Sequence, residues 1–251
     1  MSIGKIVLDD DLLCHYLAGK KTKKYKNLMK KYIFPHATNF KQLSKVITEN
    51  KELNKQNQFG SLLSQMANES YNNDDLELLA SKTTFKIILT TDKEKKFPFI
   101  HYENYSVNNR LTFNLSPTDS RTILTKYLQE LCCEAKRVVI CDNYFASNWV
   151  HTESLFLSIL PRKNLNIEYA ETMPQTSTTL NSQFITPGYV SSVWPGWAVS
   201  STTELKYLNC HDRYLLIESS SGRIEVMLSS GFSHIWHPTP KEITCVFNEI
   251  Q

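Results

Sequence analysis

The fold of the second half of the chain is decided by two neighbouring runs, Asn-Cys-His-Asp-Arg-Tyr-Leu-Leu-Ile-Glu at residues 209–218 and Gly-Arg-Ile-Glu-Val-Met-Leu at residues 222–228. Both runs are extended in character and a Ser-Ser-Ser-Gly turn joins them, which predicts a β-hairpin. His211 and Arg213 stand two residues apart, so an extended strand would place both on one face of the pleat. An imidazole beside a guanidinium suits a phosphodiester, because histidine can attack or carry a proton and arginine offers several donors to phosphate oxygens.

The pattern His211-x-Arg213-x4-Glu218 resembles a conservatively altered H-x-K-x4-D motif of the phospholipase D superfamily. In that family the histidine attacks phosphorus, the lysine clamps a phosphate oxygen and the acid buttresses the hairpin. This sequence has Arg for the lysine, Glu for the acid, and Ser229-Ser230-Gly231 in place of a Gly-Ser-x-Asn motif. The wording His-Asp-Arg-Tyr is similar to the phospholipase-D-like C-terminal domain of MIT-domain proteins, which carries one motif copy, pairs as a dimer and is described as binding lipid.

The resemblance implies an α/β fold, with a phospholipase-D-like sheet-and-helix domain at residues 118–251. It implies catalytic roles for His211, Arg213 and Glu218. The candidate phosphate-binding or site-edge residues are Ser229, Ser230, His234 and Asp142. Two interpretations of Asp142 stay open, since it follows a predicted strand and could either position a catalytic group or cap the next helix.

The overall composition indicates a soluble cytoplasmic protein of one large or two small domains. The chain has 251 residues, of which 41% are hydrophobic, and no apolar run approaches the roughly 20 residues of a membrane span. The first residues do not resemble a secretory signal. The six cysteines form no C-x-x-C pair and no zinc-finger spacing. They are therefore predicted to be free thiols in a reducing compartment, and no metal or cofactor is expected.

Positive charge is concentrated near the N-terminus. Residues 1–60 contain 12 lysines, no arginine and five acidic residues, a formal charge of +7 in a chain whose net charge is +3. The densest run, interleaved with tyrosines, contains Lys20, Lys21, Lys23, Lys24, Lys26, Lys30 and Lys31. Two interpretations stay open: these lysines bind the phosphates of a nucleic acid, or they are a solvated helix face.

Residues 1–117 are predicted to form a basic, mostly helical α+β region. Residues 5–8 predict a short strand, and the run Asp9-Asp10-Asp11 then starts a helix, where acidic side chains favour the helix dipole. A strand followed by acids also resembles the start of a PIN-type nuclease, in which carboxylates gather around a divalent metal. Helix capping is the favoured interpretation, because no later acidic cluster completes such a site.

The second half alternates between helical and extended patterns, which is typical of an α/β fold. Residues 123–131 predict an amphipathic helix. The run Val138-Val139-Ile140-Cys141 predicts a buried parallel strand. Residues 171–202, rich in Thr, Ser, Pro and Gly, predict a long connection, and residues 205–208 are expected to add to the sheet.

Two functional hypotheses follow from the single motif copy. The phospholipase D reaction needs two histidines, so the first hypothesis is a metal-independent homodimeric nuclease, with the second histidine supplied by another chain. The resemblance also suggests an effector in a prokaryotic antiviral defence or mobile-element system. The alternative is a catalytically silent binding and dimerisation module, a subunit of a larger nucleic-acid-binding or lipid-binding assembly. Nucleic acid is the expected partner, with DNA or RNA and a phospholipid partner left open.

Overall fold

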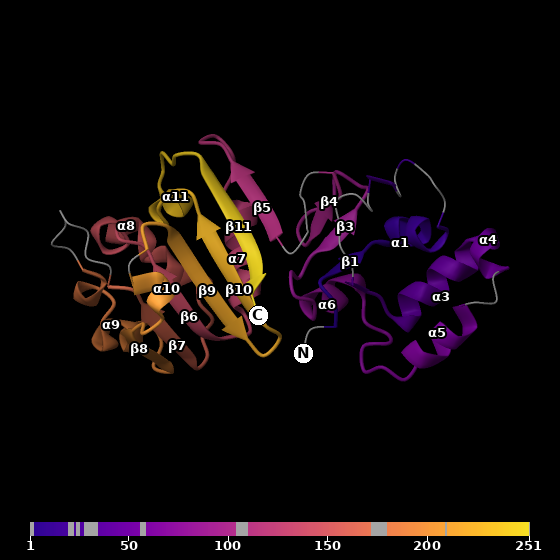
Figure 1. Cartoon of the computed structure of the whole chain (residues 1–251), viewed down its shortest axis with the longest axis horizontal. Helices are drawn as coiled ribbons and strands as arrows, with labels where there is room; N and C mark the ends of the chain where they lie inside the picture. The colour runs from indigo at the N-terminus through magenta and orange to yellow at the C-terminus, as the bar shows by residue number, and fades with distance from the viewer. Residues whose placement is uncertain are drawn as a thin grey trace. The chain divides into compact units, whose positions relative to one another are not determined.

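The computed structural model describes residues 3–19, 23, 26–27, 35–55, 59–103, 110–171, 180–208 and 210–250. The chain divides into two compact units, Met1–Asn109 and Arg110–Gln251 (Figure 1). The sequence placed the junction at residues 117 and 118 instead. The difference arises because strand β5 (Arg110–Leu115) pairs with β11 (Ile243–Ile250), near the end of the chain. That pairing assigns β5 to the second unit.

The described part of the first unit contains a four-stranded sheet of order β2-β1-β3-β4 in which every pairing is parallel. Its strands are β1 (Ile6–Leu8), β2 (His36–Ala37), β3 (Ile88–Thr90) and β4 (Phe99–His101). Its helices are α1 (Asp10–Leu17), α3 (Phe40–Glu49), α4 (Lys51–Asn54), α5 (Phe59–Met66) and α6 (Leu76–Ser81). The unit is therefore α/β, where the sequence predicted α+β.

The aspartates after β1 act at a helix start. All three residues of β1 are buried, and the Asp9 side chain accepts a hydrogen bond from Leu12 N at 2.9 Å. Asp9 is thus the N-cap of α1, which turns Leu12 and Leu13 into the core. The helix-capping interpretation is confirmed for Asp9.

The described part of the second unit is built on a seven-stranded sheet of order β5-β11-β10-β9-β6-β7-β8 (Figure 1). The pairings from β5 to β6 are antiparallel, and those from β6 to β8 are parallel. Its further strands are β6 (Ala135–Cys141), β7 (Leu165–Tyr169), β8 (Trp197–Ser201), β9 (Arg213–Ser219) and β10 (Arg223–Leu228). The predicted hairpin is confirmed as β9 and β10, and the predicted buried strand as β6.

Helical segments surround this sheet: α7 (Thr122–Cys132), η1 (Ala146–Asn148), α8 (Trp149–Thr152), the π-helix η2 (Leu155–Ile159), η3 (Asn181–Gln183), α9 (Pro187–Val193), α10 (Leu205–Leu208) and α11 (Ser233–Trp236). On one face Tyr127 of α7 packs on Phe113 and Phe247, with ring centroids 5.4 and 4.8 Å away. On the other face Tyr207 of α10 packs with Val139 and Leu216. Helices thus cover both faces, as the α/β class requires.

Residues 171–208 differ from the sequence prediction. The predicted connection contains α9 and the edge strand β8, and residues 205–208, expected in the sheet, form helix α10. Trp197 in β8 is buried and its Nε1 donates to the Pro161 carbonyl at 3.0 Å. Among the helices of the described ranges, none combines the length and apolar character that a membrane span needs.

Candidate functional site

Residues at or just after the ends of three strands meet at one edge of the seven-stranded sheet. Because β9 runs antiparallel to both β6 and β10, its first residue, Arg213, lies beside the last residues of those strands. Asp142 follows β6, and Gly231 follows β10 by a short loop. We call Asp142, Tyr144, Arg213, Gly231 and His234 the sheet-edge cluster. The structure thus brings together three residues that the sequence had singled out separately.

Asp142 is the buried anchor of this cluster, with 1% of its surface exposed. It accepts hydrogen bonds from Tyr144 N at 2.9 Å and from Phe232 N at 3.0 Å. Burial raises the pKa of Asp142, while these two hydrogen bonds and the charge of Arg213 act in the opposite direction. Asp142 therefore links β6 to the loop after β10 and faces Arg213, which fits a positioning role.

Arg213 makes long contacts on two sides. Its side chain is 26% exposed, and Nε lies 3.8 Å from Asp142 Oδ1, too far for a hydrogen bond. The guanidinium carbon lies 5.8 Å from the centre of the Tyr144 ring, a side chain that is 48% exposed. The Nε atom is buried, and the described residues supply no hydrogen-bond acceptor for it. A Cβ at Gly231 would lie 3.9 Å from Nε, an ordinary contact, so the loop after β10 passes directly beside the guanidinium.

The predicted phosphate-binding residues lie at the same edge but differ in what they offer. Ser229 Oγ accepts a hydrogen bond from Thr244 N at 2.8 Å, and Ser230 Oγ donates to the Glu242 carbonyl at 3.0 Å. Both hydroxyls thus hold the loop after β10 against the start of β11. The Nδ1 atom of His234 accepts from Lys241 N at 3.2 Å, which leaves its Nε2 edge as the side a ligand would meet.

His211 and Glu218 do not occupy the positions that the motif predicts for them. The strand begins at Arg213, and His211 occupies an exposed bend before it. The expectation that His211 and Arg213 share one pleat face depended on a strand containing both residues. Glu218 lies near the other end of β9, where Arg137 Nη1 donates to it at 3.0 Å and Arg223 lies 3.8 Å away. The structure therefore does not bring Glu218 to Arg213.

Arg137, at the start of β6, centres a network of ion pairs at that other end. Its guanidinium donates to Glu168 at 2.6 and 2.8 Å and to Glu204 at 2.6 Å, in addition to Glu218. Thr202 Oγ1 also donates to Glu168 at 2.8 Å. The network joins β6, β7 and β9, so it stabilises the sheet.

The basic run of the first unit is only partly within the described residues. Lys23 and Lys26 are both exposed. The remaining candidates lie outside the described residues: Lys20, Lys21, Lys24, Lys30 and Lys31. Polyanion binding by this run therefore stays a prediction.

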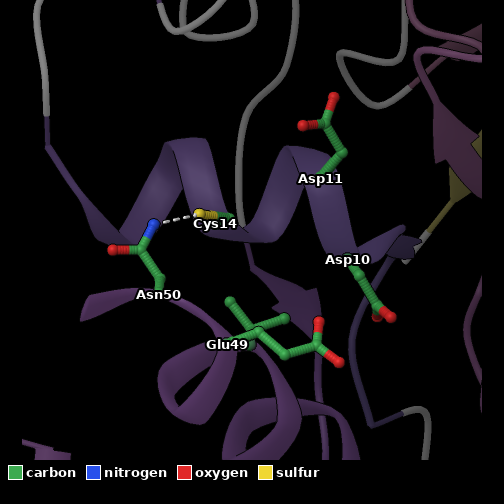
Figure 2. Close-up of a pocket in the computed structure, with 6 residues that line it drawn as sticks. Asp10, Asp11, Cys14, Glu49 and Asn50 are labelled. Carbon is green, nitrogen blue, oxygen red and sulfur yellow. Dashed lines mark hydrogen bonds between the residues drawn. The ribbon is translucent and has the colours of Figure 1, made fainter. Parts of the chain in front are cut away.

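The first unit has a hollow of about 200 Å³ between α1 and the end of α3 (Figure 2). It is lined by Asp10, Asp11, Cys14, Val46, Glu49 and Asn50. Two of its three carboxylates have partners within the chain, because Lys45 Nζ lies 2.7 Å from Asp10 and Thr91 Oγ1 donates to Asp11 at 2.9 Å. Within the described ranges, no three His, Cys, Asp or Glu side chains converge as a metal site. The sheet-edge cluster is the stronger candidate.

Some residues of the site were not among the predicted site residues. Tyr144 and Gly231 stood inside quoted runs but had no predicted role, and Lys241 carried no motif. The place of Gly231 depends on a contact with Asp142, far away in the chain. The pair His234 and His237 around Trp236 was the one available signal. The chain matches no protein-family model and no curated protein.

Proposed function

We propose that the sheet-edge cluster binds the phosphate group of a phosphodiester, with Arg213 as the clamp. The observation that carries this proposal is the buried Nε of Arg213, for which the described residues supply no acceptor. A buried donor without an acceptor costs about 1–3 kcal/mol, and more when the group is charged. The side chain as a whole is 26% exposed, so a small rotation of the guanidinium would let Nε and a terminal nitrogen donate to two oxygens of a phosphate, which would remove that cost.

Asp142 prepares the clamp without saturating it. At 3.8 Å its carboxylate attracts the guanidinium but forms no hydrogen bond with Nε. Tyr144 supports the guanidinium from its ring face. The arginine is therefore oriented in advance, so less side-chain entropy is lost when an anion binds.

Binding is better supported than turnover. Glu218 lies at the opposite end of β9, and His211 lies in the bend before the strand. We therefore favour a phospholipase-D-like module for binding and dimerisation, a subunit of a larger nucleic-acid-binding or lipid-binding assembly. Its place in a prokaryotic defence or mobile-element system is part of the same proposal and depends on the motif resemblance.

A metal-independent homodimeric nuclease is the second candidate. The observation in its favour is the exposure of His211 only two residues before Arg213, which leaves its imidazole accessible to a substrate and to a second copy of the chain. In this case cleavage of nucleic acid persists in EDTA and is abolished by His211→Ala, while binding is retained. Absence of cleavage by the wild-type protein contradicts the nuclease and leaves the binding module.

The clamp is tested by titrating the full chain with a fluorescent dithymidine, which contains a single phosphodiester, and with an oligothymidylate. We expect Arg213→Ala to weaken the binding of both probes by about tenfold or more, because a charge-assisted hydrogen bond contributes roughly 1.5–3 kcal/mol. Arg213→Lys should retain part of the affinity. The matched control is Lys136→Ala, which removes one exposed positive charge near the start of β6. Equal losses in Arg213→Ala and Lys136→Ala would show that only net charge matters and contradict the clamp.

A further inference from the structure

Imidazole side chains continue from the sheet-edge cluster along α11 and the loop after it. His234 lies in α11, and His237 follows that helix. Their ring centroids are 6.2 Å apart, and His151 of α8 lies 4.4 Å from His237. The bond from Phe232 N to Asp142 fixes the start of this segment beside Arg213. The histidines and Arg213 therefore belong to one edge of the second unit.

The backbone fixes the tautomers of two of these rings. Lys241 N donates to Nδ1 of His234 at 3.2 Å, and Thr239 N donates to Nδ1 of His237 at 3.0 Å. A nitrogen that accepts an N–H carries no proton of its own, so the proton of each neutral ring is on Nε2. Among the described residues, none accepts a hydrogen bond from either Nε2 atom. Both rings therefore offer a donor while neutral.

Three cations lie near these rings, together with three carboxylates. The charged and titratable groups on the neighbouring elements are Arg121, Asp119, Asp142, His151, Arg213, Lys241 and Glu242. Arg121 Nη2 donates to the Lys241 carbonyl at 2.8 Å, which ties two cations to one loop. Burial lowers the pKa of His234, and the charges that lower it further are those of Lys241, His237, Arg213 and Arg121. The cations that lower the pKa of His234 also attract an anion to this ring.

We infer that His234 and His237, with Lys241 and Arg121, extend the Arg213 site into a surface for successive phosphates of one single-stranded nucleic acid. The histidines donate through Nε2 in their neutral form. This inference rests on the proposed function, since Arg213 holds the first phosphate. The half-exposed Tyr144 ring beside Arg213 supplies an aromatic face on which a base can stack.

A single strand of nucleic acid fits this edge better than a membrane surface does. Membrane-surface binding needs a continuous apolar face beside the basic groups. In the described part of this edge, the large exposed apolar side chains include Val150 of α8, which is 79% exposed, and Tyr144, which is 48% exposed. These two side chains do not make a continuous insertion face, whereas the donors and Tyr144 match the two needs of a single strand of nucleic acid, phosphate contacts and base stacking.

The test compares two probes of different length on the full chain. The probes are an oligothymidylate of about twelve nucleotides and a dithymidine with one phosphodiester. We expect the double variant His234→Ala/His237→Ala to weaken binding of the longer probe by about tenfold, because hydrogen bonds to charged phosphates are lost. Its binding of dithymidine should change by less than about twofold. His234→Gln/His237→Gln should recover most of the affinity, because the glutamine amide replaces the Nε2 donor. Wild-type affinity should change by less than about threefold between about pH 6 and about pH 8, because neutral rings donate.

The outcomes separate this inference from the proposed function. If Arg213→Ala binds dithymidine as the wild type does, the clamp itself is wrong. Arg213→Ala could lose affinity for dithymidine while the double alanine variant binds the longer probe as the wild type does. In that case only the extended surface is wrong. Loss of affinity for phosphatidylserine vesicles, with unchanged oligothymidylate binding, assigns the histidines to a membrane surface and overturns the inference. A wild-type affinity that rises strongly as pH falls, together with a glutamine variant that binds no better than the alanine variant, contradicts the neutral-donor role. Thermal unfolding of each variant checks that it folds.

Discussion

Two arginines near opposite ends of the β6–β9 pair show how the same side chain serves different purposes. Arg137 is 21% exposed and is bound by the carboxylates of Glu168, Glu204 and Glu218. Arg213 is 26% exposed, lies 3.8 Å from Asp142 and has a buried Nε without an acceptor in the described residues. Exposure is nearly equal, so it does not separate the two. The number of acceptors does: three carboxylates bind Arg137, which makes it structural, whereas Nε of Arg213 has none, and this is why we propose Arg213 as the ligand site.

The largest effect on stability is expected from Arg137→Ala. The change leaves three partly buried carboxylates facing one another without their shared cation, so the free energy of unfolding should fall by about 2–4 kcal/mol. Urea unfolding followed by tryptophan fluorescence measures this loss. The neighbouring exposed Lys136→Ala is the control and should change stability by less than about 0.5 kcal/mol. Similar losses of stability in both variants would show that Arg137 is not a structural residue.

Arg213→Ala should cost much less stability, about 1 kcal/mol or less. The reason is that the native state makes only a long ion pair with Asp142 and gains little from it. The same urea titration gives the value, and the phosphate titrations give the loss of binding on the same sample. A destabilisation as large as that of Arg137→Ala would make Arg213 a structural residue and would contradict the binding proposal.

The variant Asp142→Asn tests how the buried carboxyl beside Arg213 makes the stability of the protein depend on pH. Burial raises the pKa of Asp142 in the folded state, so the folded protein binds this proton more tightly than the unfolded chain. The contribution to stability is therefore fully present below the unfolded pKa and is lost as pH rises through the folded pKa. Relative to Asp142→Asn, the wild type should gain stability as pH falls from neutral to about 4. Parallel stability curves for the two proteins would contradict this.

Gly231→Ala should give the smallest effect. The added Cβ would lie 3.4 Å from Asp142 Oδ2, an ordinary contact, so the free energy of unfolding should change by less than about 0.5 kcal/mol. The same methyl group lies 3.9 Å from Arg213 Nε and narrows the approach to it. We expect dithymidine affinity to fall by roughly twofold to fivefold. Unchanged affinity would place the phosphate on another side of the guanidinium.

The sequence by itself determined the elements whose pattern is local. The extended runs around the Ser-Ser-Ser-Gly turn predicted the β9–β10 hairpin, and the turn residue Gly222 has a φ of 151° that favours glycine. The continuous apolar run at residues 138–141 predicted β6, and the aspartates after β1 predicted the cap of α1. Each of these depends on neighbours within a few residues, so periodicity and capping chemistry are sufficient to find them.

Only the tertiary structure decided the remaining features. Strands of two or three residues in the first unit are too short to show a period, so their parallel pairing was not predictable. The unit boundary depends on β5 meeting β11, and only one of the five residues of β8 is buried because it is an edge strand. Asp142 reaches Phe232 across 90 residues, and Arg137 reaches Glu218 across 81. Contacts of that span decide which arginine is satisfied within the chain and which is left to bind a ligand, because no local pattern records the acceptors that folding brings near.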